Sequence, residues 1–510
     1  MNTETQEFRY PRRWLTLAVL CISLLVISLD NTILNVALPT LGRDLDATSS
    51  QLQWIVDSYM LVFAGLLLTA GALGDRFGRR RALTAGLAIF GLGSALSALA
   101  GSAGMLIASR ALMGVGGAFI MPSTLSILTA TFPARERAKA IGIWAATSGL
   151  GIAIGPVAGG WIVEHADWSW IFLVNLPLVF AGLVAQRPLV PESRDPAAPR
   201  LDVPGFALST AGLTALVWGI IEAPDRGWTD ARILAAFGLA VAMLSAFAVW
   251  ETRAEEPMLD VRLFRNRRFS AASGAIALSF FALFGSIFFL TQYLQLVLDY
   301  APFAAGLGVL PVAGGIALAS PLSARLTAAR GAKLVVAAGL VTVSAGLLLM
   351  TGFAPDSSYG IVAASYALLG IGIGLAMTPA TDSVMGSLPL AKASVGSAVN
   401  DAARTTGGAL GVAVLGSILS SGYRGDMDVV SAPAVAHDSL AGALAVAARA
   451  GGAAGERLTE TAQQAFVSGM HAAVLVAAGI AIVGALVALV FLPSRAAEPA
   501  LAIVPEAAPA

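Results

Sequence analysis

The chain has 510 residues, of which 57% are hydrophobic and only 12% are charged, against roughly a quarter charged in ordinary soluble domains. This composition excludes a soluble globular domain and indicates an integral membrane protein. The formal net charge is zero, so we expect no basic surface for nucleic acid. Cys21 is the single cysteine, which excludes an internal disulfide. All but three of the 31 basic residues are arginine, which indicates a high-GC bacterial genome.

Membrane-spanning helices need about 20 mainly apolar residues each. The sequence predicts fourteen, at about 14–38, 52–73, 82–100, 103–130, 138–162, 170–186, 203–221, 231–250, 269–297, 303–323, 334–352, 359–387, 395–420 and 466–492. The first run is too long for a signal peptide, and we expect it to be retained. The segments between the runs leave no room for a soluble catalytic domain, so we expect no enzyme.

Basic residues set the orientation of the predicted spans. With the N-terminus inside, 23 lysines and arginines lie in cytoplasmic segments and six outside, while Arg110 and Arg404 lie within spans. We therefore expect a multi-pass protein of the bacterial cytoplasmic membrane with both termini in the cytoplasm.

An internal repeat relates the first six runs to the last six. The segment GALGDRFGRRR (71–81) follows the second run, and SPLSARLTAARGAK (320–333) follows the tenth, with Ala324 in the place of Asp75. Two such halves around a central site are a transporter layout. We expect an N-terminal six-helix half at 1–186, two inserted helices and linkers at 187–268, a C-terminal six-helix half at 269–492 with an external loop at 422–465, and a disordered cytoplasmic tail at 493–510.

Small residues dominate the fifth run in GLGIAIGPVAGG (149–160). Gly151, Gly155 and Gly159 are four residues apart and form one smooth helix face, beside Pro156. In lipid such a face allows close approach of another helix, so one interpretation of the segment is a packing seam alone.

Taken together, these segments resemble the Major Facilitator Superfamily, in its fourteen-span drug:proton antiporter branch of the quaternary ammonium compound and multidrug resistance type. The motifs that carry the resemblance are LDNTILNVALP (29–39), GALGDRFGRRR, RALMGVGGAFIMP (110–122), GLGIAIGPVAGG, WSWIFLVNLP (168–177), QYLQLVLDYAPFAAGLGVLP (292–311) and NDAARTTGGALGVAV (400–414). The resemblance implies an all-α major facilitator fold, with two pseudo-symmetric six-helix halves plus two inserted helices.

The resemblance also assigns roles to two motifs. Residues of the loop motif would form a cytoplasmic gate, namely Gly71, Asp75, Arg76, Gly78 and Arg79. The glycine-rich segment would be the antiporter motif, Gly151, Gly155, Pro156 and Gly159, which is associated with exporters. A positive topology signal alone would explain the arginines of the loop motif but not Asp75 or the glycines.

Charged residues inside spans are functional candidates because each costs about 2.5–3.5 kcal/mol at mid-helix. At 1.5 Å per residue, Asp30 lies about 12 Å and Arg110 about 10 Å from the outer ends of their spans, and Asp57 lies at a similar level. In the second half, Asp382, Asp401 and Arg404 form a charge cluster near the inner side.

Each half thus holds two carboxylates for one arginine. The surplus carboxyl lies in a low-dielectric place, where it can hold a proton or attract a cation. We expect Asp30 to be the main proton site, with Arg110 its partner and Asp57 a helper or cation-binding acid. The structural alternatives are a hydrogen-bonding role for Asp30 with Asn31 or Asn35, exposure of Asp57 to external water, and an intrahelical pair between Asp401 and Arg404.

We therefore expect a proton-coupled multidrug exporter of hydrophobic or cationic compounds that works by alternating access. An exporter dedicated to one antibiotic or metabolite is the alternative. The expected partners are small drug-like molecules, protons and the bilayer, with no cofactor, no metal and a monomeric chain. The sequence has no cluster with metal-ligand spacing.

Overall fold

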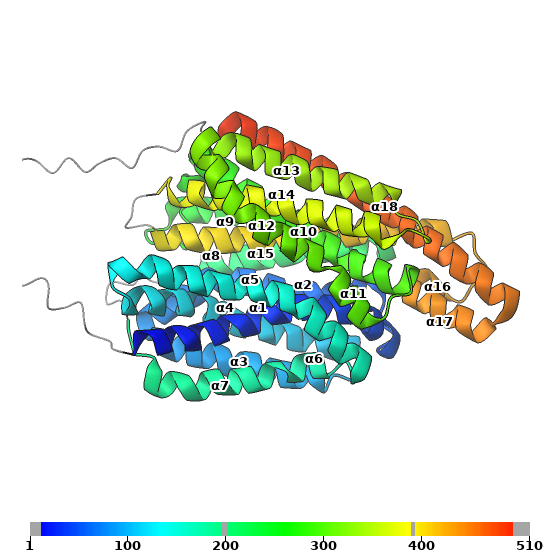
Figure 1. Ribbon diagram of the computed structural model, residues 1–510, viewed down its shortest axis with the longest axis horizontal. Coiled ribbons are helices and arrows are strands. Elements are labelled where there is room, and N and C mark those ends of the chain that lie inside the picture. Colours follow the sequence, from blue (N-terminus) through cyan, green and yellow to red (C-terminus); the bar gives the residue numbers. More distant parts are fainter. Residues whose placement is uncertain (1–11, 195–200, 389–392, 493–510) are drawn as a thin grey trace, which may run out of the picture.

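The computed structural model describes residues 12–194, 201–388 and 393–492, and the expected tail at 493–510 lies outside them. The described residues form a bundle of helices without strands (Figure 1). Fourteen of the helical segments are long and apolar enough to span a membrane. The predicted all-α fold with fourteen spans is confirmed, and each predicted span overlaps one of these segments.

The helices follow one another along the chain with short connections. The first half contains α1 (Arg13–Asp44), α2 (Ser49–Phe77), α3 (Arg79–Ala98), α4 (Ala103–Thr131), α5 (Ala134–His165), α6 (Trp170–Leu173) and α7 (Asn175–Leu189). The inserted segment contains α8 (Val203–Arg226), α9 (Ala231–Arg253) and η2 (Val261–Arg265). The second half contains α10 (Arg267–Gln292), η3 (Tyr293–Val297), α11 (Pro302–Gly308), α12 (Leu310–Arg330), α13 (Ala332–Leu349), η4 (Met350–Gly352), α14 (Tyr359–Met385), α15 (Ala393–Met427), α16 (Ala434–Asp438), α17 (Leu440–Ala450) and α18 (Gly452–Phe491).

Local sequence signals explain several helix ends. Thr48 and Gln51 form a capping box that starts α2, with each side chain bonded to the backbone of the other residue. Gly78 separates α2 from α3 with a φ of 121°, a conformation that favours glycine. Asp202 caps α8 by accepting from the Gly205 N–H at 2.8 Å.

The two halves lie side by side in Figure 1, with helices α1–α7 below and α10, α12–α15 and α18 above, while α11, α16 and α17 lie beside the first half at the right. Helix α1 begins and α18 ends at the same end of the bundle, which we call the terminal end; the other is the distal end. Helix α2 packs against α4 and α15, and α5 packs against α1 and α11. The α8–α9 hairpin contacts both halves, because α8 packs against α2 and α15.

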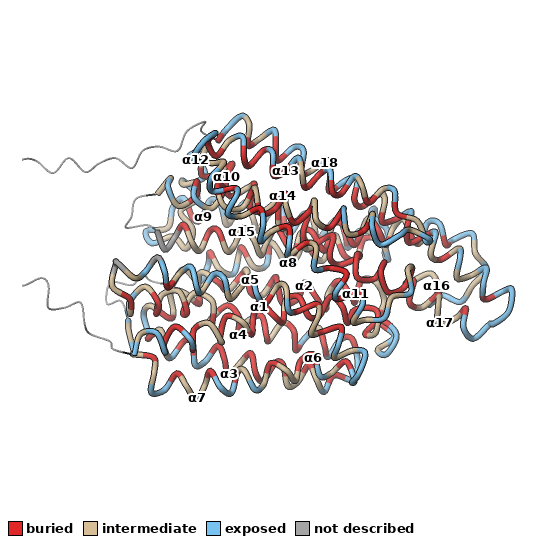
Figure 2. The backbone as a smooth tube through the Cα atoms, in the orientation of Figure 1, coloured by how far each residue is buried: buried red, intermediate tan, exposed pale blue. Residues whose placement is uncertain are grey.

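The halves meet at the distal end. Thr291 donates to the Asn35 carbonyl and Gln295 to the Val36 carbonyl, both at 2.8 Å. Among the described residues, every hydrogen bond between the helices of the two halves lies at this end. In the first part of α5, from 136 to 150, Ala140 is the one buried residue among those whose burial is described, whereas the glycines Gly151, Gly155, Gly159 and Gly160 in its distal part are buried, and Figure 2 colours the whole backbone by burial. Within the described residues, the halves are therefore hydrogen-bonded to each other at the distal end alone.

The segment 422–465, expected to be an external loop, is mostly helical. Helix α15 continues to Met427, α16 and α17 follow, and α18 begins at Gly452. At 1.5 Å per residue the 40 residues of α18 extend about 60 Å, twice the thickness of the hydrocarbon core. Its first part therefore projects beyond the bundle with α16 and α17 (Figure 1). Alanine has the highest helix propensity, which explains why this alanine-rich stretch folds as helices.

Candidate functional site

A buried ion pair joins α1 to α4. The Asp30 Oδ2 atom lies 2.5 Å from Arg110 Nη1, and both side chains are almost completely buried. Asn175 of α7 donates to the other Asp30 oxygen at 3.2 Å. Arg110 also donates from Nε to the Ile55 carbonyl at 3.2 Å, and its guanidinium lies 4.7 Å from the centre of the Tyr59 ring. Four spans thus position one carboxylate and one guanidinium.

Glycines of α4 make room for α2 beside this pair. A Cβ atom at Gly114 would lie 2.6 Å from the Tyr59 carbonyl oxygen, and one at Gly117 would lie 2.8 Å from the Tyr59 hydroxyl. Larger residues would force α2 away, because Cβ contacts this short essentially do not occur. The glycines of RALMGVGGAFIMP therefore hold the Tyr59 ring over Arg110.

Asp57 is fully buried but is not bonded to the pair. Neither of its carboxylate oxygens has a hydrogen-bond partner, although both are inaccessible. Asp57 lies one helical turn after Gln53, on the same side of α2. Gln53 faces α15, where Ser417 donates to it at 3.4 Å. Helix geometry therefore puts Asp57 on the side of α2 that packs against α15, and the structure brings only Asp30 and Arg110 together.

The glycine-rich face of α5 packs on α1. Cβ atoms at Gly151 and Gly159 would lie 3.1 Å from the Leu29 nitrogen and 2.8 Å from the Ile33 oxygen. A Cβ at Gly155 would overlap Thr32, whose hydroxyl donates to the Gly151 carbonyl at 3.2 Å. The expected close-packing seam is therefore present. Its partner is the same helix that carries Asp30.

The same end of α5 also touches the second half. The carbonyl of Pro156 blocks the space of a Cβ at Gly306 of α11, and the Pro302 carbonyl does so at Gly160. Glu164 accepts from the Phe303 N–H at 3.0 Å. The antiporter segment thus lies in two seams, one within its half and one between the halves.

The charge cluster of the second half is more open. Asp401 and Arg404 of α15 are half-buried, and Asp382 of α14 is exposed. Among the described residues no carboxylate oxygen lies within ion-pair distance of Arg404, so the expected intrahelical pair is not formed. Arg404 lies 5.4 Å from the centre of the Phe280 ring. Asp401 and Arg404 thus leave their charges free for other partners.

The loop motif lies at the terminal end. Asp75, in the last turn of α2, accepts from Arg79 at 2.6 Å. Gly71 packs on Pro122 of α4, and a Cβ at Gly78 would lie 2.8 Å from Glu192. Arg76 is exposed. The five expected gate residues therefore lie together around the α2–α3 turn.

Sequence reasoning missed several partners of these groups. Asn175 lies in the motif WSWIFLVNLP (168–177), but the sequence predicted no role for it, because only the tertiary fold brings α7 to Asp30. Tyr59 carries no charge, so the search for charged residues inside the spans did not identify it. Glu192 accepts from the Arg80 N–H at 3.1 Å and was hidden in a linker. The described residues contain no group of three His, Cys, Asp or Glu side chains that could hold a metal ion.

Comparisons with known proteins agree with this architecture. The family model described as Major Facilitator Superfamily matches residues 20–412. The multidrug efflux pump LfrA of Mycolicibacterium smegmatis is 39% identical over 93% of this chain and 96% of its own length. The tetracenomycin C resistance and export protein of Streptomyces glaucescens is 35% identical over 96% of this chain and 93% of its own.

A solved structure shares the fold. The bacterial homologue of the human lysosomal transporter Spinster, in an inward-facing and unoccupied conformation, superposes with a TM-score of 0.68 at 18% identity. The match covers 95% of this chain and 99% of that one. The protein is a multi-pass bacterial membrane protein of a transporter family rather than an enzyme. It belongs to the Major Facilitator Superfamily, in the fourteen-span drug:proton antiporter branch.

Proposed function

We propose that this protein is a proton-coupled exporter of hydrophobic and cationic drug-like compounds that works by alternating access. The observation that carries the proposal is the buried acid Asp57, whose two oxygens have no partner, at the contact between the two halves. An uncompensated carboxylate in such a place is unfavourable unless it takes up a proton or meets a cation. A group of this kind is what proton-coupled exchange requires.

The orientation follows from the basic residues. Of the segments that carry 23 of the 31 lysines and arginines, described ones such as 76–81 and 262–268 lie at the terminal end. We therefore propose that this end, with both termini, is in the cytoplasm. We propose that this state faces inward, because the hydrogen bonds that join the halves lie at the distal, outer end. It is the state in which a substrate enters from the cytoplasm or the inner leaflet.

Asp30, Arg110 and Asp57 form the proposed proton-coupling group. Asp30 already has the Arg110 guanidinium and the Asn175 amide as donors, so both of its oxygens are engaged in this state. Asp57 has no donor, and we propose that it holds the proton here. Asp30 and Arg110 lie in the same half, and we propose that Asp30 acts as the main proton site when a local shift of α1 against α4 breaks their pair.

The second cluster is the proposed contact for cationic substrates. Asp401 is not engaged in an ion pair within the described residues, and the Phe280 ring lies beside Arg404. We propose that an organic cation meets the Asp401 carboxylate and competes with Arg404 for the face of the Phe280 ring. Asp382 lies near the terminal end of α14, where an incoming cation would pass first.

We propose that the gate and the antiporter segment act when the two halves move against each other. Asp75, Arg76 and Arg79, with Gly71 and Gly78, would close the cytoplasmic side in the outward-facing state. The α5 seam at Gly151, Gly155, Pro156 and Gly159 keeps α5 against α1 while the halves rock. We place the halves at 1–186 and 269–492, with the insert at 187–268, so that one chain supplies both sides of the path and works as a monomer.

The coupling ion is the proton, and no cofactor is proposed. One elementary charge gains about 2.3 kcal/mol per 100 mV. Exchange of one proton for one monovalent cation moves no net charge and uses only the pH gradient. Export of a neutral compound uses both the gradient and the potential.

A second candidate function is export of a single antibiotic or metabolite. It is favoured by relatives whose names refer to one compound, such as the puromycin resistance protein of Streptomyces alboniger, 38% identical over 80% of this chain. The two functions share one mechanism and differ in the breadth of the substrates.

Transport of ethidium by proteoliposomes under an imposed pH gradient tests the proposal. We expect uphill movement that an uncoupler abolishes and that Asp57→Asn eliminates. Asp428→Asn is the matched control, because Asp428 is exposed on the distal side. Normal coupled transport by Asp57→Asn would contradict the role of Asp57. Transport of puromycin or tetracenomycin C but of no dye would identify the dedicated exporter.

A further inference from the structure

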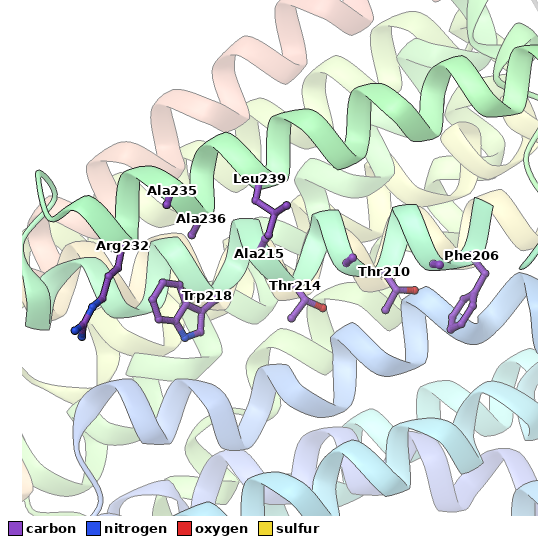
Figure 3. Close-up of a pocket in the computed structure, with 11 residues that line it drawn as sticks. Phe206, Thr210, Thr214, Ala215, Trp218, Arg232, Ala235, Ala236 and Leu239 are labelled. Atoms are coloured by element: carbon purple, nitrogen blue, oxygen red, sulfur yellow. The ribbon is translucent and has the colours of Figure 1, made fainter. Parts of the chain in front are cut away.

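The inserted hairpin carries a groove that the transport mechanism does not use. The groove lies between α8 and α9 and has a volume of about 660 Å³. It is lined by five alanines, with Phe206 toward one end and Trp218 and Arg232 toward the other (Figure 3). Leu239 and most of these alanines are exposed, so the groove opens to the surface that the membrane covers.

Small side chains between bulky ones create the groove. On α8, Ala207, Ala211 and Ala215 recur every four residues and lie on one face. From Phe206 to Trp218 this face is about 18 Å long, at 1.5 Å per residue. One leaflet of the hydrocarbon core is about 15 Å thick. The groove therefore has the length of one acyl chain lying along the hairpin.

A free positive charge marks one end of the groove. Arg232 is exposed, and no carboxylate of the described residues forms an ion pair with it. The nearby Asp230 carboxylate accepts from the Arg232 backbone N–H at 2.7 Å and thereby caps α9. Arg226 pairs with Glu222 at 2.9 Å, so these two charges cancel. Arg232 in the first turn of α9 adds to the positive end of that helix.

We propose that this groove binds one phospholipid from the leaflet at the distal end of the bundle. One acyl chain lies over the alanines, between Phe206 and Trp218. The phosphate meets Arg232 and the N-terminal turn of α9. The Arg232 guanidinium favours an anionic headgroup such as phosphatidylglycerol, because the neighbouring Asp230 carboxylate is bonded to the α9 backbone and leaves the guanidinium free for the phosphate.

Native mass spectrometry of the purified full-length protein with added dioleoyl phosphatidylglycerol tests the proposal. Two variants address the two parts of the site. Ala211→Leu with Ala215→Leu fills the groove, and Arg232→Gln removes the charge. The matched controls are Ala472→Leu and Arg457→Gln, an exposed alanine and an exposed arginine of α18. Thermal unfolding of each variant verifies that it is folded.

We expect one tightly held lipid in the parent protein and in both controls. Affinity should fall about tenfold in Arg232→Gln, the effect of one charged contact, and the adduct should disappear when the groove is filled. Equal lipid adducts in all variants would overturn the proposal. So would a dimer that the groove-filling variant abolishes, since a second copy would then occupy the face, or displacement of the lipid by ethidium, since the groove would then be a substrate path.

Discussion

Removing one partner of the Asp30–Arg110 pair should destabilise the protein strongly. In Asp30→Asn the Arg110 guanidinium stays buried with only the Ile55 carbonyl and the Tyr59 ring as neighbours that favour its charge. Breaking a buried pair in this way costs about 3–5 kcal/mol, because an uncompensated charge remains. The Asn175 amide, which donates to Asp30 at 3.2 Å, keeps an acceptor in Asp30→Asn and does not offset this loss.

A double-mutant cycle measures the interaction. The free energy of unfolding is determined in mixed micelles for the parent, Asp30→Asn, Arg110→Gln and the double variant. We expect the double variant to lose about 1–3 kcal/mol less than the sum of the single losses. Ser148→Ala with Arg110→Gln is the control cycle, because Ser148 bonds Ser28 on α1 at 3.1 Å but does not contact Arg110. Additive losses for Asp30 and Arg110 would refute the argument that the two charges stabilise each other.

Two further predictions concern seams. Gly159→Ala should lower the free energy of unfolding by about 1–3 kcal/mol through overpacking, because the new methyl would lie 2.8 Å from the Ile33 oxygen. The control Gly149→Ala has open space around it and should leave the free energy of unfolding unchanged. Equal effects of the two substitutions would contradict the seam. Arg424→Gln removes the ion pairs of Arg424 with Asp225 at 2.6 Å and Asp438 at 3.1 Å. Because Asp225 also accepts from Ser50 of α2 at 2.7 Å, the loss should loosen the distal contact between α2 and α15. A thiol placed by Gln53→Cys in a Cys21→Ser background should then react with a maleimide several-fold faster, whereas an unchanged rate would show that these pairs do not hold that end closed.

Periodic and compositional signals made the membrane architecture predictable. Each apolar run had to form a helix, because a helix satisfies its own backbone groups in lipid. Depth counted along two helices placed Asp30 and Arg110 at one level, and the structure pairs them. Their spacing along the chain contributed nothing, since 80 residues separate them.

Interactions that depend on side-chain direction could not be predicted. Asp401 and Arg404 are correctly spaced for an intrahelical pair, yet Arg404 turns to the Phe280 ring instead. Asp57 was expected near the Asp30 pair because it has the same depth, but it lies on the side of α2 toward α15. Depth gives the level of a residue in the membrane, whereas its azimuth depends on how the helices are rotated in the bundle.

Among the described residues, helix α8 is hydrogen-bonded to the two halves only near its distal end. Ser50 of α2 donates to Asp225 at 2.7 Å, and Ser417 of α15 donates to the Ile220 carbonyl at 2.7 Å. Both bonds are near the end of α8 where the halves meet. When the two halves separate there, α8 can follow only one of them and must release the other. Loss of these hydrogen bonds thus opposes the rocking motion and contributes to the free-energy difference between the inward-facing and outward-facing states.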